Sequence, residues 1–154
     1  MVVAIGVHPN TDFLNREEID MLGNGAIIIN SFGRTSVPNI YAAGDAASVY
    51  HRVRGDNVYI PLATTSNKIG RVLGEHLAGK DITFPGTLGS AAIKVIDLEA
   101  GRTGITENEA RELKIPYKAV FVEDYNQTGY YPGRETLYGK LIINSETREI
   151  LGWG

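Results

Sequence analysis

The stretch TSVPNIYAAGD, from Thr35 to Asp45, decides how this sequence is interpreted. Its apolar run, Asn39 to Ala43, lies between turn residues, and this pattern predicts a short buried strand. The run ends on Gly44 and Asp45, so we expect a polar group to approach the backbone closely there. Three explanations are open: a tight turn, a metal ion, or the hydroxyls of a sugar-like ligand.

Composition excludes several classes of protein. The chain has 154 residues and a net charge of −3 with both signs interspersed, which argues against a nucleic-acid surface. It has no cysteine, and therefore no disulfide, thiolate metal site or thiol redox chemistry of its own. No apolar stretch approaches the roughly 20 residues of a membrane helix. These features predict a cytoplasmic protein that binds neither nucleic acid nor membrane.

The clearest helix should run from about Thr64 to Leu77, because its apolar residues recur at helical spacing. Thr64, Thr65 or Ser66 is expected to cap its start, and Gly79 lies where a C′ glycine belongs. Gly70 and Gly74 fall on one face, which predicts close packing against another element. Before this helix we expect strands over 2–7 and 26–30, and a turn or short helix over 13–21.

The segment 81–86, which contains Phe-Pro-Gly, is the expected linker. After it, 91–98 reads as a strand and 101–104 as a turn. Thr106 and Glu109 form a capping box that opens a helix through Lys114. Strand-like runs follow over 117–123, 136–144 and from 150 onward. The order βαβββ predicts a small α+β domain.

Two groups of residues could carry chemistry. Asp45, at the carboxyl end of a predicted strand, could accept hydrogen bonds from ligand hydroxyls, or it could simply turn the chain. The helix start near Thr64 offers free backbone N–H groups and the positive end of a dipole. His8, His51 and His76 have no metal-ligand spacing, so we expect no metal site.

A second unusual stretch is GYYPG, residues 129–133. Its two phenols, Tyr130 and Tyr131, sit on a Pro-Gly loop and would present rigid, amphipathic groups at a surface. Such groups suit an interface or the rim of a ligand site. Ordinary packing across the loop is the alternative.

Four stretches in order carry a resemblance: AIGVHPNT (4–11), TSVPNIYAAGD (35–45), PLATTSNKIGR (61–71) and TGYYPG (128–133). The chain resembles the C-terminal half of a pyridine nucleotide–disulfide oxidoreductase, in the coenzyme A-disulfide reductase and NADH oxidase subgroup. The resemblance implies an α/β part followed by an α+β part. Residues 1–10 would be the tail of an NAD(P)-binding domain, 11–82 the C-terminal part of an FAD-binding domain, and 83–154 a dimerisation domain truncated at its C-terminus.

The resemblance also implies roles for single residues. Asp45 would bond the ribityl hydroxyls of FAD, and Gly44 would allow close approach. The pyrimidine side of the flavin would receive backbone amides from Leu62, Ala63 and Thr64. Gly6 would lie near the nicotinamide cofactor. Tyr130 or Tyr131 would reach across a homodimer, formed through residues 85–154, into the partner's active site.

The family's glycine-rich FAD motif and redox cysteine are absent from this sequence. We therefore expect a fragment of an FAD- and NAD(P)H-dependent enzyme whose small-molecule substrate is a thiol or disulfide, a persulfide, or oxygen or peroxide. By itself the fragment should be inactive and hold no cofactor tightly. The alternative is a stand-alone dimerisation or binding module without redox activity.

Overall fold

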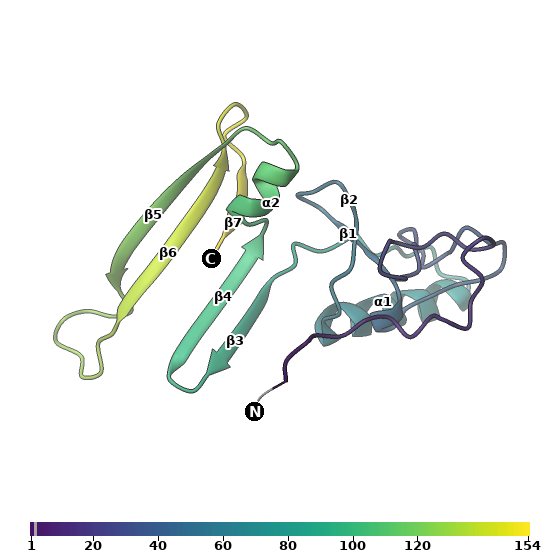
Figure 1. Cartoon of the computed structure of the whole chain (residues 1–154), viewed down its shortest axis with the longest axis horizontal. Coiled ribbons are helices and arrows are strands. Elements are labelled where there is room, and N and C mark those ends of the chain that lie inside the picture. The colour runs from purple at the N-terminus through teal and green to yellow at the C-terminus, as the bar shows by residue number, and fades with distance from the viewer. Residues whose placement is uncertain (2) are drawn as a thin grey trace. The chain divides into compact units, whose positions relative to one another are not determined.

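The computed structural model describes residue 1 and residues 3–154, and it divides into two units, Met1–Thr87 and Leu88–Gly154 (Figure 1). The predicted strand over 2–7 includes Val2, which lies outside the described residues. Residues 3–7 are exposed and form no strand. No helix in the described part of the chain combines the length and apolar character that crossing a bilayer requires.

The described residues of the first unit form one 3₁₀ turn, two short strands and one longer helix. The 3₁₀ turn η1 (Gly44–Ala46) leads into strands β1 (Val49–His51) and β2 (Asp56–Val58), and helix α1 (Ala63–Leu77) follows. The two strands pair antiparallel, with Val49 opposite Val58. Helix α1 confirms the predicted helix: it begins one residue before the expected start at Thr64 and ends at Leu77, as expected.

The predicted strands over 26–30 and 39–43 are wrong for the described residues. Ile27 makes single bridges to Met21 and Ala47, and Tyr41 makes one to Arg34. A strand needs a partner with which to build a ladder of several hydrogen bonds, and each of these runs forms only isolated pairs. Residues 26–29 are nevertheless largely buried, so the apolar pattern of this first run predicted burial correctly. The 13–21 segment forms turns and no helix.

The core of the first unit is a cluster of aliphatic side chains, mostly isoleucine: Ile19, Ile27, Ile29, Ala47, Val49 and Ile69. Helix α1 contributes to it through one face, since Thr65, Ile69 and Val72 are buried at helical spacing. The expected linker is docked on this unit, because Phe84 packs against the cluster and its N–H donates to the carbonyl of Ser31 at 2.8 Å.

Two expectations about α1 are wrong. The N-cap is Leu62, with no side-chain hydrogen bond, so none of the three hydroxyl residues caps the helix. A Cβ built at Gly70 or Gly74 would meet no neighbouring atom within 4 Å. Both glycines are exposed, so their surface is not packed against another part of the described chain. Gly79, with φ of 92°, takes the left-handed conformation expected after the helix.

The second unit is a five-stranded antiparallel sheet with one short helix. Its order along the chain is β3 (Ala91–Val95), β4 (Leu98–Gly104), α2 (Glu107–Glu112), β5 (Tyr117–Tyr125), β6 (Thr136–Asn144) and β7 (Ile150–Trp153). In space the order is β3-β4-β7-β6-β5. The α+β class is confirmed, and the strand bounds of β6 match the expected range.

The connection between β3 and β4 differs from expectation. The predicted single strand over 91–98 is broken by a two-residue turn at Ile96 and Asp97, with Val95 opposite Leu98. The unit is therefore ββαβββ rather than βαβββ. Ile96 has φ of 55° and is 84% exposed, an unusual conformation for a β-branched residue. The turn lacks glycine, which explains why the pattern did not reveal it.

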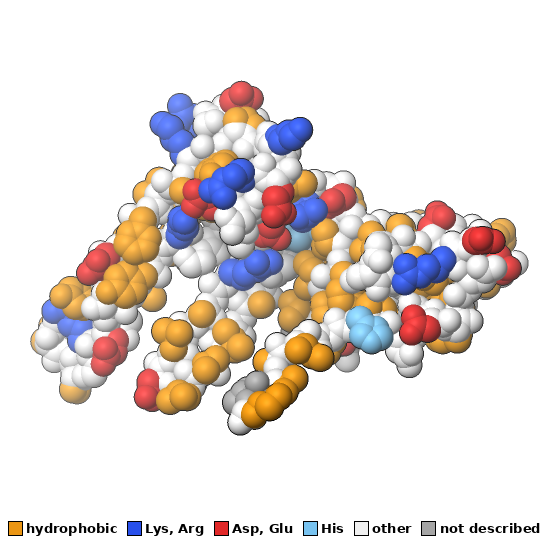
Figure 2. All heavy atoms as spheres, in the orientation of Figure 1, with side chains coloured by type: hydrophobic (Ala, Val, Ile, Leu, Met, Phe, Trp, Pro, Cys, Tyr) orange, Lys and Arg blue, Asp and Glu red, His pale blue; other side chains and the backbone are white. Residues whose placement is uncertain are grey.

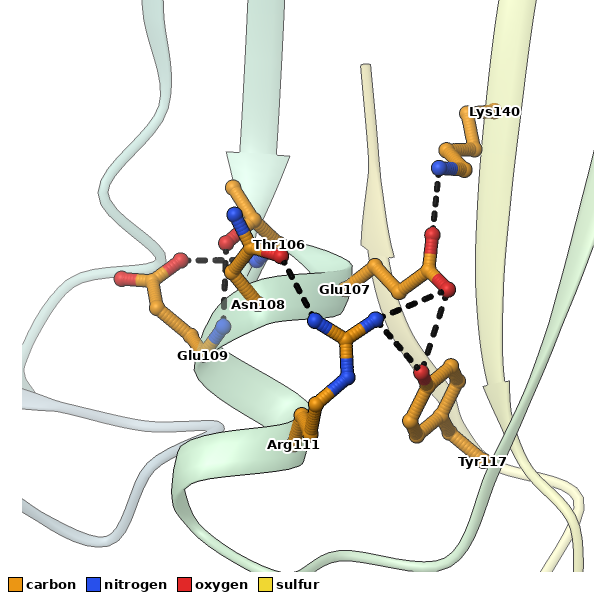
Figure 3. Close-up of polar contacts among 7 residues, drawn as sticks. All are labelled: Thr106, Glu107, Asn108, Glu109, Arg111, Tyr117 and Lys140. Carbon is orange, nitrogen blue, oxygen red and sulfur yellow. Dashed lines mark hydrogen bonds and ion pairs between the residues drawn. The ribbon is translucent and has the colours of Figure 1, made fainter.

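Helix α2 is held to the sheet by its first turn (Figure 3). The predicted capping box is confirmed, with the Glu109 amide donating to Thr106 Oγ1 at 3.2 Å and the Thr106 amide donating to Glu109 Oε2 at 2.7 Å. Glu107 accepts hydrogen bonds from Lys140 of β6 and from the Tyr117 hydroxyl at 3.1 Å. These contacts, Lys140 first, hold the pKa of Glu107 below its usual value.

Candidate functional site

The first group of interest lies where η1 meets the start of α1. Gly44 has φ of 83°, and the amide of Ala47 donates to its carbonyl at 3.2 Å to close the turn. This conformation favours glycine, which explains the Gly-Asp pair at the end of the apolar run. Asp45 follows with an exposed side chain, which accepts a hydrogen bond from the hydroxyl of Ser66 in the first turn of α1.

The start of α1 is open at its N-terminal end. Leu62 has extended backbone angles, φ −117° and ψ 126°, and its carbonyl accepts the amides of Thr65 and Ser66, both at 2.9 Å. Ala63 and Thr64 are exposed, and no side chain caps the helix. The positive end of the helix dipole therefore faces the surface beside an exposed carboxylate.

This group combines an acceptor with donors. The carboxylate of Asp45 suits ligand hydroxyls, and the uncapped amides at 63–64 suit a carbonyl or an anionic ring. The structure thus places η1, with Gly44 and Asp45, next to the start of α1, where Leu62, Ala63 and Thr64 lie. Sequence reasoning missed Ser66 as the partner of Asp45, although its place in the first helical turn is a usable signal.

Gly6 is not part of this group in the described residues. It lies in an exposed segment without secondary structure and has φ of 79°. A Cβ built there would meet no atom within 4 Å. The structure leaves space for a ligand to approach its backbone, and it provides no contact that defines one.

The first unit also carries an apolar pocket of about 530 Å³. Its lining includes Phe13, Ile19, Val37, Ile40 and Tyr41. Asp45 is not among its lining residues.

The second group is the tyrosine loop, residues 126–135, which joins β5 to β6. Tyr130 is 82% exposed and Tyr131 is 56% exposed, so packing across the loop does not bury either phenol. Their ring centroids lie 4.9 Å apart with the planes tilted by 33°. The loop therefore presents two adjacent phenols to the outside of the second unit.

Hydrogen bonds within the tyrosine loop fix its backbone. The amide of Asn126 donates to the carbonyl of Glu135 at 3.0 Å, and the amide of Tyr131 donates to the carbonyl of Thr128 at 3.1 Å. Across the loop, Gln127 Nε2 donates to the carbonyl of Pro132 at 3.0 Å. The loop thus closes on itself rather than extending as a free segment.

Exposed hydrophobic side chains gather on two hairpins of the second unit (Figure 2). On β5 and β6 they include Val120, Phe121, Val122, Tyr125, Leu137 and Tyr138, and on the β3–β4 hairpin Ile93, Val95, Ile96 and Leu98. Phe121 and Tyr138 stack with centroids 6.0 Å apart. By the strand register these side chains are divided between the two faces of the β5–β6 hairpin, and exposed apolar side chains gathered in this way are typical of a surface that binds another protein.

Two family models match the chain. Residues 1–70 match the pyridine nucleotide-disulphide oxidoreductase model, and residues 90–154 match the dimerisation domain of the same family. Together the two matches cover most of the chain, and each falls within one of the two units.

Curated relatives agree with these matches. The chain is 40% identical over 152 residues to an NAD(P)H sulfur oxidoreductase (CoA-dependent) from Pyrococcus furiosus, covering 99% of this chain and 34% of that protein. It is 32% identical over 152 residues to a coenzyme A disulfide reductase from Staphylococcus aureus strain Newman, covering 98% and 34%. The chain thus spans about a third of the length of the curated relatives it matches.

A solved structure extends the agreement to the fold. The water-forming NADH oxidase from Lactobacillus brevis, bound to NADH, superposes with a TM-score of 0.88 at 36% identity, covering 97% of this chain and 33% of that one. Sequence identity and backbone superposition therefore indicate the same group of proteins. The chain belongs to the pyridine nucleotide-disulphide oxidoreductase family, with its second unit in that family's dimerisation domain.

Proposed function

We propose that this chain is part of an FAD-dependent enzyme that oxidises NAD(P)H and reduces a sulfur-containing small molecule. The observation that carries the proposal is the exposed carboxylate of Asp45 beside the uncapped start of α1. In this proposal residues 1–10 end an NAD(P)-binding domain, 11–82 complete an FAD-binding domain, and 83–154 form the dimerisation domain.

The residues present fit FAD. Asp45 would accept hydrogen bonds from the ribityl hydroxyls, and the left-handed Gly44 adds no side chain at that turn. Backbone amides at Ala63 and Thr64 would face the pyrimidine side of the ring, whereas the expected contribution of Leu62 is not available in this conformation because its amide donates to the carbonyl of Ile60 at 2.9 Å. FAD supplies two-electron transfer when it is bound, and a helix N-terminus stabilises the negative charge of its reduced form. Gly6 would lie near the nicotinamide cofactor.

The names of the relatives support a sulfur substrate. The Pyrococcus furiosus protein is called a sulfur oxidoreductase and the Staphylococcus aureus protein a coenzyme A disulfide reductase. We infer a disulfide or persulfide as the acceptor, with oxygen or peroxide as the second candidate because the Lactobacillus brevis protein is a water-forming NADH oxidase.

The second unit supports a homodimer formed through residues 85–154. Its exposed apolar hairpins offer the contact surface, and the match to a dimerisation domain favours a second copy as the partner. Tyr130 or Tyr131 would then act in the partner's active site, where a phenol can donate a hydrogen bond or a proton to a sulfur substrate.

By itself the chain should bind flavin weakly and lack catalysis. Its sequence contains no glycine-rich motif for the FAD pyrophosphate and no cysteine. The adenine half of the cofactor would therefore gain little binding energy from these residues.

Titration of riboflavin and FAD into the purified chain, followed by flavin fluorescence, tests the first unit. We expect weak binding of both, with Asp45→Asn lowering the affinity about tenfold, which corresponds to about 1.4 kcal/mol. Asp81→Asn, an exposed carboxylate elsewhere in the unit, is the matched control. Equal affinities for the wild type and Asp45→Asn would refute the role of Asp45, and stoichiometric FAD in the purified chain would refute weak binding.

The exposed apolar hairpins of the second unit support a second candidate, a dimerisation or binding module without redox activity. This candidate predicts self-association together with no flavin binding at any concentration. The same titration therefore separates the two functions.

A further inference from the structure

The tyrosine loop is ordered by more than its backbone. Arg134 lies near the end of the loop, and its guanidinium carbon lies 3.3 Å from the ring centroid of Tyr125, the last residue of β5. A guanidinium at this distance makes a close cation–π contact. Arg134 therefore ties the end of the loop to the strand from which the loop starts.

The same guanidinium also reaches the tip of the loop. A Cβ built at Gly129 would lie 3.0 Å from Nη1 and 3.8 Å from Cζ of Arg134. Gly129 does not have a positive φ, so its backbone conformation is open to any residue. Glycine at 129 instead leaves room for the guanidinium of Arg134, which occupies the adjacent space.

These two contacts place one side chain against Tyr125 at the base and against Gly129, which immediately precedes Tyr130. We propose that Arg134 is a positioning residue that fixes the direction in which Tyr130 and Tyr131 leave the second unit. The inference rests on the proposed function, in which these phenols act in a partner subunit. It concerns orientation alone, since Arg134 itself need not contact substrate.

The planar guanidinium is suited to this role. It can lie flat on an aromatic ring while its edge meets a neighbouring backbone, whereas a lysine ammonium is a compact point charge. Within the described residues Arg134 forms no salt bridge with a carboxylate. Stacking rather than ion pairing therefore accounts for its position.

The test measures backbone order of residues 129–131 by ¹⁵N NMR relaxation in the purified chain, together with the ring signals of selectively labelled tyrosine. In the wild type we expect order parameters of about 0.8 at these amides, and below about 0.6 in Arg134→Ala. Gly129→Ala should lower the order of the same amides less than Arg134→Ala, because its methyl group requires only a small shift of the guanidinium. Arg134→Lys should restore the order only in part.

Lys118→Ala, an exposed cation on β5, is the matched control and should leave the loop unchanged. The melting temperature should stay the same in all four variants, since the contacts lie outside the core. Wild-type order at residues 129–131 in Arg134→Ala would overturn the proposal.

This outcome is separate from that of the proposed function. Asp45→Asn should leave the loop amides ordered, and Arg134→Ala should leave riboflavin affinity unchanged, because the two residues belong to different units. A failed flavin titration with a disordered Arg134→Ala loop would thus refute the flavin site and retain the positioning role.

Discussion

The hydroxyl of Ser66 donates a hydrogen bond to the carboxylate of Asp45, across 21 residues of sequence. One partner belongs to η1 and the other to the first turn of α1, so this bond joins the acceptor of the candidate flavin site to the helix that supplies its donors. It sets the direction of an exposed carboxylate that would otherwise sample several rotamers.

Ser66→Ala tests the value of that orientation. The variant keeps the charge of Asp45 and loses its partner, so riboflavin affinity should fall by about threefold, less than in Asp45→Asn. Ser66→Thr, which retains the hydroxyl, should stay close to the wild type. Fluorescence titration measures both, with Asn67→Ala on the exposed part of the same turn as the control. An affinity in Ser66→Ala as low as that of Asp45→Asn would indicate that Ser66 contacts the ligand directly.

Gly70→Ala and Gly74→Ala should stabilise the first unit. A methyl group at either position meets open space, and glycine within a helix costs about 1 kcal/mol relative to alanine. Each substitution should raise the free energy of unfolding by about that amount in urea denaturation followed by circular dichroism. Gly33→Ala provides the contrast, since Gly33 has φ of 77° and its Cβ would lie 3.3 Å from Leu73. A loss of stability in Gly70→Ala would mean that this face of α1 is covered in solution.

The stability of the second unit should depend on pH through Glu107. Its pKa is lowered in the folded state, mainly by the hydrogen bond from Lys140 and then by that from Tyr117. A carboxyl group of this kind stabilises the fold above its unfolded pKa of about 4.3, and the contribution disappears as the pH falls through the lower, folded pKa. Glu107→Gln should therefore weaken the fold at pH 7 and reduce the loss of stability below pH 4.

Urea unfolding followed by the fluorescence of Trp153, the single tryptophan, reports on this unit. Glu112→Gln is the control, because Glu112 is exposed on the same helix. Identical pH profiles for the wild type and Glu107→Gln would contradict the prediction.

Phe121→Asp should weaken self-association. Phe121 stacks on Tyr138 within the exposed apolar surface of the β5–β6 hairpin, and a carboxylate there would have to be desolvated on dimer formation. Light scattering over a range of concentrations should give a dimer for the wild type and mainly monomer for the variant. Phe13→Asp, at a more exposed phenylalanine of the first unit, should remain dimeric. A monomeric wild type at high concentration would contradict the proposed homodimer.

Elements with strong local signals could be predicted from the sequence. Helix α1 follows from apolar spacing, α2 from its capping box and β6 from a strand-like run. The run at 26–30 failed as a strand because apolar composition indicates burial, whereas a strand requires a neighbour that the run itself does not specify. At 39–43 the predicted burial is wrong as well, since Asn39 and Ile40 are exposed and residues 41–43 are half-buried. The turn at Ile96 failed because it uses a residue that such turns normally avoid.

The candidate site, too, could be predicted from the sequence only in part. Asp45 and the start of α1 could be found because each carries a recognisable local pattern. The contacts that orient them, Ser66 with Asp45 and Arg134 with Tyr125, join residues 21 and 9 positions apart through side-chain geometry. The position of Ser66 in the first helical turn is a local signal, but no periodicity or spacing rule identifies its partner or that of Arg134, so the pairings are found only in the folded chain.

The left-handed Ile96 has a consequence for how this hairpin tolerates change. Asparagine or glycine would relieve backbone strain of about 1 kcal/mol at that position, yet either would remove a branched hydrocarbon from the outermost point of the turn. Backbone strain thus favours asparagine or glycine at position 96, whereas an exposed apolar surface favours isoleucine. Replacing Ile96 by asparagine should therefore stabilise the turn and reduce the exposed apolar surface of the β3–β4 hairpin at the same time.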